Sequence, residues 1–156
     1  MAQANAPLGP GDKVPALTLD GTGGTVALAE LSRALLIFYP KDATSGCTSE
    51  LQDFSARAEA FAAAGYRIFG ISPDGIESHR RFIQKAGLAL PLLADEGAAA
   101  ARAFGVWGEK TTFGKSYMGL IRSTFAIEAP GTISAHWTVA RVKGHAEAVL
   151  SALTKG

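Results

Sequence analysis

The feature that most constrains the fold is a near-continuous apolar run, Ala34 to Tyr39, followed at a distance by a second run, Tyr66 to Ile71. A strand that is apolar at nearly every position suits the middle of an α/β sheet, where both of its faces are covered. The segment between the runs has apolar residues at helical spacing, and Gly65 is placed to end that helix. We therefore expect two core strands joined by a helix.

The rest of the chain extends this pattern to the order β-β-β-α-β-α-β-α-β-β-α. The order predicts an α/β fold with a mixed central sheet, helices on both faces and an N-terminal β-hairpin. Residues 1–9 are expected to form a flexible tail, and 10–156 a single domain. In the first half of the chain we expect a hairpin turn at 20–24 and a capping box of Asp74 and Glu77 that opens a helix. An Ala-rich helix through Phe104 and a loop over 105–119 are expected to follow. The chain should end with strands over 121–128 and 132–139 and a helix that bears Ala146, Val149, Leu150 and Leu153.

Composition excludes several classes of protein. Apolar residues make up 47% of the 156, which argues against a disordered chain, and 15 basic against 14 acidic residues argue against a nucleic-acid binder. No apolar run approaches the roughly 20 residues of a membrane helix, so we expect no membrane partner, and no signal peptide is visible. We expect no cofactor and no metal, because the three histidines are widely separated and the glycines of 21–24 lack a Walker lysine.

Cys47 is the only cysteine, and it lies where the first core strand gives way to the helix. One cysteine excludes an intrachain disulfide and favours a cytoplasmic protein whose thiol is kept reduced. The free N–H groups and partial positive charge of a helix start favour thiolate over thiol, and the thiolate is the nucleophile. Upstream, Thr44 can bring a hydroxyl near the sulfur and Pro40 can shield it from water. The alternative is a small buried core residue, with Pro40 ending a strand and Thr44 entering a helix.

Arg122 is the second candidate, because it lies inside the strand pattern of residues 121–127. An arginine in a core strand is costly unless it has a partner, and a thiolate is one such partner. The alternative is an edge-strand arginine that points to solvent.

Taken together, these segments resemble the peroxiredoxins, specifically the bacterioferritin-comigratory-protein or PrxQ class, over nearly the whole chain. The resemblance is carried by motifs in a fixed order: Phe38-Tyr39-Pro40-Lys41-Asp42, Thr44-x-x-Cys47-Thr48, Ile71-Ser72-Pro73-Asp74, Glu77-Ser78-His79, Val106-Trp107-Gly108-Glu109-Lys110, Gly114-Lys115-x-Tyr117-Met118-Gly119 and Arg122-Ser123-Thr124-Phe125.

The resemblance implies a thioredoxin-like fold and a thiol peroxidase that reduces hydrogen peroxide and organic hydroperoxides, with an antioxidant role in cell redox homeostasis. By position, Cys47 is implied to be the peroxidatic cysteine, forming a sulfenic acid. Thr44 and the Cys47 backbone N–H would hold the peroxide oxygens, Arg122 would stabilise thiolate and peroxide, and Pro40 would shield the sulfur. The implied supporting residues are Gly46, Glu50, Tyr39 and Trp107.

Two departures from the family pattern affect the expected cycle. Many members carry a resolving cysteine where this chain has Gln52, others carry one in the region of residues 82–84, and this chain has neither. The sulfenic acid is therefore expected to need an external thiol, from thioredoxin, glutaredoxin, glutathione or a second chain, in a monomer or a linked dimer. Ser45 replaces the usual proline and should leave the loop slightly less rigid. The alternative function is a redox sensor or thiol-based binding protein that is oxidised at Cys47 without efficient turnover.

Overall fold

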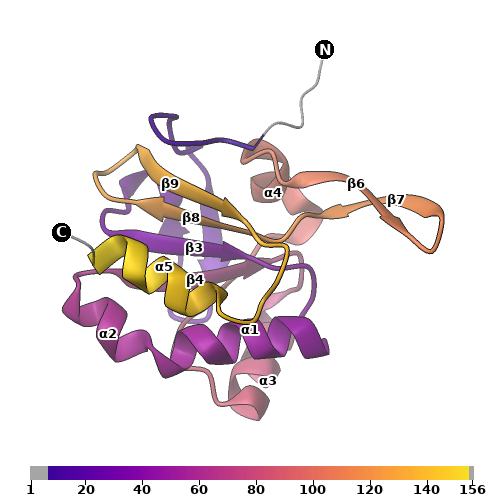
Figure 1. Ribbon diagram of the computed structural model, residues 1–156, viewed down its shortest axis with the longest axis horizontal. Coiled ribbons are helices and arrows are strands. Elements are labelled where there is room, and N and C mark those ends of the chain that lie inside the picture. Colours follow the sequence, from indigo (N-terminus) through magenta and orange to yellow (C-terminus); the bar gives the residue numbers. More distant parts are fainter. Residues whose placement is uncertain (1–6, 155–156) are drawn as a thin grey trace.

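A seven-stranded mixed sheet forms the centre of the computed structural model, which describes residues 7–154 (Figure 1). Across the sheet the strands are β2 (Val26–Ala27), β1 (Thr18–Gly21), β5 (Leu92–Ala94), β4 (Arg67–Ser72), β3 (Ala34–Phe38), β8 (Ser123–Ile127) and β9 (Ile133–Thr138). β3, β4 and β5 run parallel, whereas β8 pairs antiparallel with β3. Every residue of β3 and β8 is buried, as the continuous apolar run predicts for a central strand.

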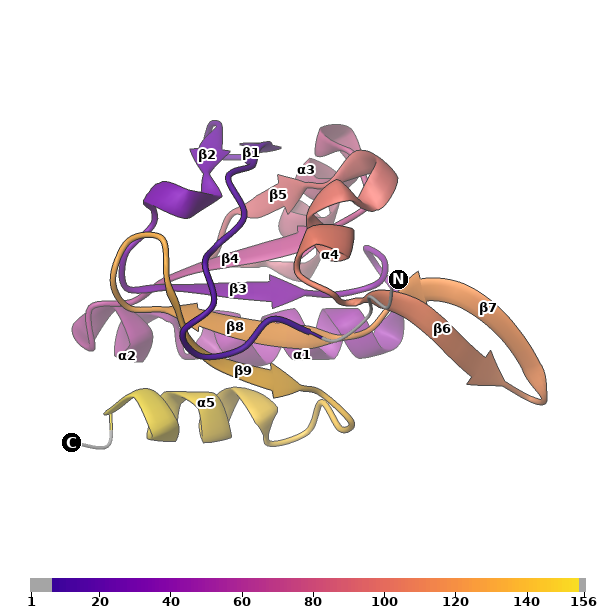
Figure 2. The ribbon, with the colours of Figure 1, turned by 90° about the horizontal axis from the view of Figure 1, so that it is seen from above.

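Helices cover both faces of this sheet (Figures 1 and 2). The lower face in Figure 1 carries α1 (Ser45–Ala56), α2 (Ala58–Ala63), α3 (Ile76–Ala86) and α5 (His145–Thr154), and the upper face carries α4 (Ala99–Ala103), with short 3-10 turns η1 (Leu28–Glu30) and η2 (Glu96–Ala98) in the connections. The expected α/β architecture and N-terminal hairpin are confirmed, since β1 and β2 pair antiparallel. The single helix expected after Cys47 is instead two helices, because Arg57 leaves helical geometry at φ −107°.

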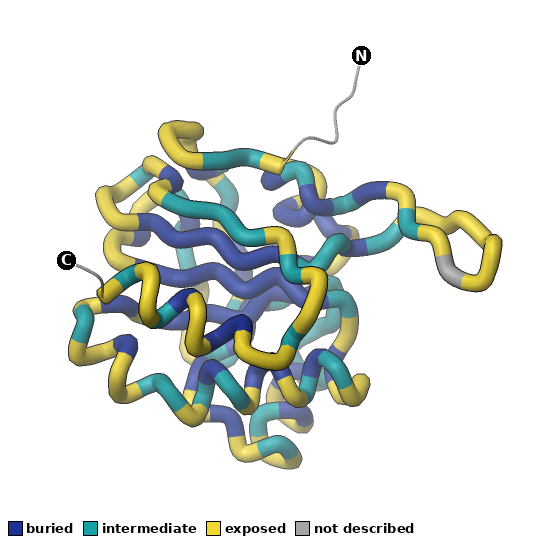
Figure 3. The backbone as a smooth tube through the Cα atoms, in the orientation of Figure 1, coloured by how far each residue is buried: buried dark blue, intermediate teal, exposed yellow. Residues whose placement is uncertain are grey.

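Alternate residues of β3 point into two separate cores. Figure 3 shows the central strands coloured as buried, between helices and loops of mixed burial. Leu36 and Phe38 pack on the α4 side, where the rings of Phe38, Phe104 and Phe125 lie within 5.0–5.7 Å of one another. The other core gathers Leu35, Ile37 and Tyr39 of the β3 segment with Cys47, Leu51 and Phe54 of α1. The helix that carries Cys47 is thus anchored by its apolar stripe against the middle of the sheet.

The prediction of a loop over 105–119 is wrong. This segment forms a hairpin of β6 (Trp107–Thr112) and β7 (Lys115–Leu120) that projects from the rest of the molecule (Figure 1). Its turn residues, Phe113 and Gly114, both have positive φ, at 53° and 79°. That geometry is typical of a two-residue type I′ turn, which fits the twist of paired strands. The glycine and aromatic content that indicated a loop therefore belongs to a tight turn and its flanking strands.

The expected capping box at the start of α3 is also wrong. The helix begins after Gly75, and no side chain caps it. Asp74 instead accepts hydrogen bonds from the Ser72 hydroxyl at 2.7 Å and from the Asp42 backbone N–H at 2.8 Å. The carboxylate that the pattern assigned to helix capping therefore fixes the loop that leads to Cys47.

At the N-terminal end, residues 1–6 of the expected tail lie outside the described residues. The Leu8 backbone N–H donates to the Phe104 carbonyl at 3.0 Å, and Gly9 N–H donates to the Asp12 carboxylate at 2.8 Å. The division into a tail and a domain starting at residue 10 stays a prediction. Within residues 7–154, none of the helices is long and apolar enough to cross a membrane.

Candidate active site

Cys47 lies in the first turn of α1, as the strand-to-helix pattern predicts. Thr44 is the N-cap, so Cys47 is the third helical residue, among the positions whose backbone N–H groups have no intrahelical acceptor. Its side chain is only 1% exposed and packs in the same core cluster as Leu51 and Phe54. The thiol is therefore both buried and close to the positive end of a helix.

Arg122 reaches this turn from the short connection just before β8. The sequence predicted that Arg122 lies inside the strand, but β8 begins one residue later, at Ser123. The Arg122 side chain therefore need not follow the alternation of side chains between the two faces of the sheet. Its Nη1 donates to Glu50 Oε1 at 2.6 Å, and a Cβ built on Gly46 would lie 3.5 Å from its Nη2. Burial opposes the guanidinium charge, yet Glu50 and Cys47 beside it raise the pKa of Arg122 above its ordinary value. The same guanidinium therefore lies beside both the carboxylate and the sulfur.

Glu50 is the counter-ion of Arg122, and its carboxyl group is buried at an energetic cost. Its side chain is 1% exposed, and its second oxygen, Oε2, is buried without a hydrogen-bond partner among the described residues. Burial raises the pKa of Glu50 from 4.5 to about 7, although Arg122 works in the opposite direction. Glu50 is one helical turn from Cys47, so both side chains lie on the same face of α1. The carboxylate can hold the guanidinium in place beside the sulfur.

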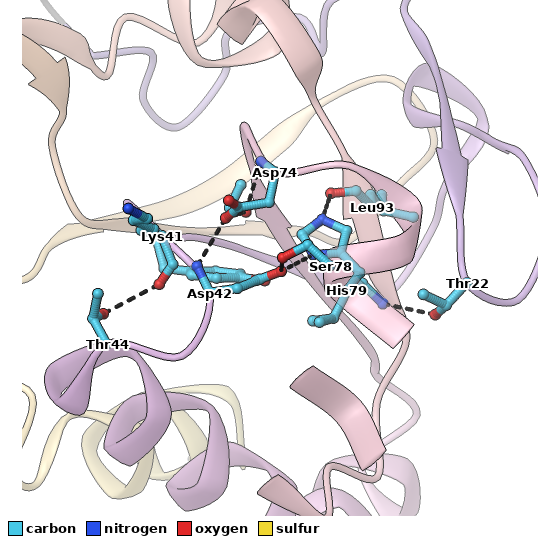
Figure 4. A network of polar contacts seen from close by, with 11 residues as sticks. Thr22, Lys41, Asp42, Thr44, Asp74, Ser78, His79 and Leu93 are labelled. Atoms are coloured by element: carbon cyan, nitrogen blue, oxygen red, sulfur yellow. Dashed lines mark hydrogen bonds and ion pairs between the residues drawn. The ribbon is translucent and has the colours of Figure 1, made fainter. Parts of the chain in front are cut away.

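The loop between β3 and α1 carries the other expected site residues. Pro40 follows the buried Tyr39 and is partly exposed, and Thr44 is exposed. The Thr44 hydroxyl donates to the Lys41 carbonyl at 3.1 Å (Figure 4). The Thr44 carbonyl accepts from the Thr48 N–H at 2.9 Å. Thr44 therefore caps the helix through its backbone, and its side chain turns back on the loop.

Sequence reasoning missed the polar network that supports this loop (Figure 4). Asp42, only 7% exposed, accepts hydrogen bonds from the Tyr39 hydroxyl at 2.6 Å, the Ser78 hydroxyl at 2.7 Å and His79 Nδ1 at 2.7 Å. Burial first, and Asp42 second, raises the pKa of Tyr39, which therefore remains a donor. Both residues lie in quoted motifs, Asp42 in the loop after a buried strand and Ser78-His79 near the start of α3, but neither segment indicates that they meet.

Trp107 was expected to support the site, but it packs with a different core cluster from Cys47. It packs against the core cluster on the α4 side, whereas Cys47 belongs to the cluster on the opposite face. Arg102 lies 5.6 Å from the centre of its indole ring. These contacts support a role in covering the core.

Gln52 occupies the position at which the family pattern implied a resolving cysteine. It lies within the intact helix α1, and its amide donates to the Ala86 carbonyl at 3.0 Å. Cys47 is the only cysteine of the sequence, so no second thiol of the same chain can meet it. Within residues 7–154, no group of three or more histidine, cysteine, aspartate or glutamate side chains is arranged to hold a metal ion.

A cysteine in the first turn of a helix, with an arginine beside it and a thioredoxin-like mixed sheet behind it, defines a thiol-based oxidoreductase. Comparison with known proteins narrows the class. The AhpC/TSA family model matches residues 10–136. Peroxiredoxin Bcp of Xanthomonas campestris is 44% identical over 138 residues, covering 88% of this chain and 86% of that protein, and Peroxiredoxin Bcp of Bacillus subtilis is 42% identical over 146 residues, covering 92% and 93%.

Solved structures agree with the sequence comparison. Peroxiredoxin Q of Xanthomonas campestris has a TM-score of 0.84 at 40% identity, covering 92% of this chain and 96% of that one. A second structure with the same scores and coverage concerns the alkyl peroxide reduction activity of the bacterioferritin comigratory protein of that organism. The chain belongs to the AhpC/TSA family, within its Bcp/PrxQ peroxiredoxins, as a one-cysteine member. It is accordingly a thiol-dependent peroxidase with a thioredoxin fold.

Proposed function

We propose that Cys47 is the peroxidatic cysteine and that it carries a one-cysteine peroxidase cycle. The observation that carries this proposal is the shared guanidinium of Arg122, which interacts with both the buried Glu50 carboxylate and the Cys47 side chain at the start of α1. A fixed cation and free N–H groups beside a nucleophile stabilise negative charge without rearrangement during the reaction.

In the first half of the cycle, the Cys47 thiolate attacks one oxygen of the peroxide. The S–O bond forms as the O–O bond breaks, the sulfur is oxidised to sulfenic acid, and the departing hydroxide or alkoxide takes up a proton to leave as water or an alcohol. Negative charge moves from sulfur to the leaving oxygen. Arg122 and the backbone N–H groups of the first turn are placed to stabilise that charge.

The remaining site residues support this step in different ways. Thr44 would direct its hydroxyl to a peroxide oxygen after giving up its bond to the Lys41 carbonyl. A Cβ built on Gly46 would lie 3.5 Å from Arg122 Nη2, an ordinary contact, so Gly46 would support the site by letting the guanidinium lie close to the first turn of α1. Pro40 would shield the sulfur, and Tyr39 holds the loop through its bond to Asp42. Trp107 has no contact that assigns it a role in this step.

In the second half, an external thiol attacks the sulfenic sulfur, releasing water and forming a mixed disulfide. A second thiol then displaces Cys47 as a thiol, and the two reductant sulfurs leave joined as a disulfide. The lone cysteine of the sequence supports an external reductant: glutathione, glutaredoxin or thioredoxin. We propose that the chain works as a monomer in the cytoplasm, where such thiols are kept reduced.

Hydrogen peroxide and organic hydroperoxides are the proposed substrates. The alkyl peroxide reduction described for the Xanthomonas campestris relative supports the organic class. The apolar surroundings of Cys47, which include Leu51 and Phe54, also suit an alkyl group better than a charged one.

Peroxide consumption under limiting enzyme tests the proposal. Glutathione with glutaredoxin, thioredoxin with its reductase, and dithiothreitol are compared, with Cys47→Ser as the blank. Many turnovers per Cys47, lost in Cys47→Ser, support the peroxidase and identify its reductant. The absence of an in-chain resolving thiol favours one other function, a redox sensor. A single equivalent of peroxide consumed under every condition would establish the sensor instead.

A further inference from the structure

His79 is fully buried and has an acceptor at each ring nitrogen (Figure 4). Nε2 lies 2.9 Å from the Leu93 carbonyl oxygen, and Nδ1 lies 2.7 Å from Asp42 Oδ2. A carbonyl oxygen only accepts, so Nε2 donates. Burial would raise the pKa of Asp42, but hydrogen bonds from His79, Tyr39 and Ser78 hold it below 3.8. Asp42 thus faces Nδ1 as an acceptor that three side chains surround, and its contact with His79 is a buried ion pair of a histidine and a carboxylate, with side chains 0% and 4% exposed.

The loop that this ion pair holds does not keep its shape by local preference. Ala43 has φ of 66°, the left-handed conformation that a residue with a Cβ rarely adopts. Its neighbour Asp42 is fixed at two points, since its carboxylate binds α3 and its N–H donates to the Asp74 carboxylate at 2.8 Å. Such a conformation persists only when surrounding structure imposes it. The loop is therefore held from outside, by α3 and the segment before it.

Cys47 cannot meet a reductant in this arrangement. Its side chain is 1% exposed, and a thiol on a peptide or protein must approach the sulfenic sulfur closely to displace water from it. A peroxide is far smaller than such a reductant. The first turn of α1 or the loop before it must therefore move between the two halves of the cycle. Asp42 lies five residues before Cys47, in the segment that has to move.

We propose that the Asp42–His79 ion pair is a loop latch: while it is intact, the loop keeps Cys47 in the arrangement that reduces peroxide, and when it breaks, the loop opens and an external thiol reaches the sulfur. This inference rests on Cys47 being the peroxidatic cysteine. His79 is then a positioning residue that acts on the reaction through Asp42. The competing interpretation is that the ion pair only stabilises the folded chain.

The test compares two substitutions of the same histidine. His79→Asn can keep a donor where Nδ1 stood, facing Asp42, whereas His79→Gln can keep one only where Nε2 stood, facing Leu93. His145→Gln is the matched control, because His145 is also buried and bonds to Thr124 at 2.8 Å, away from the loop. Ser78→Ala removes one neutral donor to Asp42 and serves if the histidine variants do not fold.

The first readout is alkylation of the reduced thiol by iodoacetamide, with hydrogen exchange of residues 41–48. Loss of a charge-assisted hydrogen bond should raise alkylation of His79→Gln roughly tenfold or more. The rise should be smaller for His79→Asn and Ser78→Ala and absent for His145→Gln. Urea unfolding gives the global stability of each variant. Alkylation and exchange that increase only as far as global stability falls, equally in His79→Gln and His145→Gln, would overturn the latch.

The second readout is the oxidised protein in single turnover. The latch requires that reduction of the Cys47 sulfenic acid by glutathione accelerates in His79→Gln by about the same factor as alkylation, while oxidation by peroxide does not accelerate. An unchanged reduction rate beside faster alkylation would count against it. Failure of the wild type to form a sulfenic acid would refute the proposed function instead, and alkylation of the reduced thiol would still decide whether His79 holds the loop.

Discussion

The buried carboxylate of Glu50 should make the stability of this protein depend on pH in a direction opposite to that of most carboxylates. The folded-state pKa of Glu50 is about 7, above its ordinary value of 4.5, because burial of the side chain outweighs the opposing effect of Arg122. The folded chain therefore binds a proton that the unfolded chain releases. The stability from this group is fully present below about pH 4.5 and is lost as the pH rises through about 7.

The size of this loss follows from the same two pKa values. A difference of one in pKa between the folded and unfolded chain corresponds to about 1.4 kcal/mol, so raising the Glu50 pKa from 4.5 to about 7 amounts to roughly 3 kcal/mol. Glu50→Gln keeps a neutral group of similar shape and cannot ionise, so it should not lose this stability. Arg122 stays charged throughout, and its attraction for the ionised Glu50 is already contained in the pKa of about 7, so it needs no separate correction.

The assay is urea unfolding followed by circular dichroism between about pH 4.5 and 8. Both proteins carry Cys47→Ser, which removes the thiol's own titration from the comparison. The free energy of unfolding of Glu50→Gln should gain on its parent as the pH rises, by up to about 1.4 kcal/mol for each increase of one in pH and roughly 3 kcal/mol in all. Parallel curves would refute the reasoning, since they would mean that Glu50 ionises as easily in the fold as in the unfolded chain.

Substitutions at other site residues have separate expected outcomes. Arg122→Lys keeps the charge but loses the planar fork, so stopped-flow oxidation by peroxide should slow by about 10²-fold, and an unchanged rate would place the guanidinium outside the reaction. Thr44→Val should slow the same step by about 10²-fold while Thr44→Ser keeps most of the rate; equal losses would show that the hydroxyl is not used. Tyr39→Phe removes a buried donor to Asp42 and should cost about 1–3 kcal/mol in urea unfolding, against less than about 0.5 for Tyr66→Phe, whose contact is 3.4 Å long. Similar costs for the two tyrosines would contradict the network.

The sequence predicted the parts of the fold that depend on local apolar pattern. The buried runs around Leu36 and Ile68 became β3 and β4, and the helix start placed Cys47 in the first turn of α1. The hairpin of β6 and β7 was missed because a turn with two positive φ angles looks like loop composition until the strands are seen to pair. A pattern reports which face is apolar, but it does not report pairing between segments.

The candidate site also contains residues that the local sequence indicates and residues that only the structure brings together. Cys47 and its helix start were readable from neighbours in the sequence, and Arg122 was noticed because a cation in an apolar strand is costly. Asp42 and His79 gave no such signal, since each is an ordinary polar residue in its own segment. Their meeting depends on the crossover that brings α3 against the loop after β3. The support of the site was therefore the part that needed the structure.

The near-complete burial of the Cys47 side chain sets different rate laws for its two reactions. With Cys47 as the proposed peroxidatic cysteine, oxidation by the small peroxide should rise in proportion to peroxide. Reduction by a bulkier thiol depends on the proposed latch, so it cannot run faster than the loop opens and should level off as reductant is added. Above that ceiling, extra reductant no longer changes the oxidised fraction. The steady-state oxidation of Cys47 then follows the peroxide supply alone, so a chain that turns over as a peroxidase would also record oxidant load.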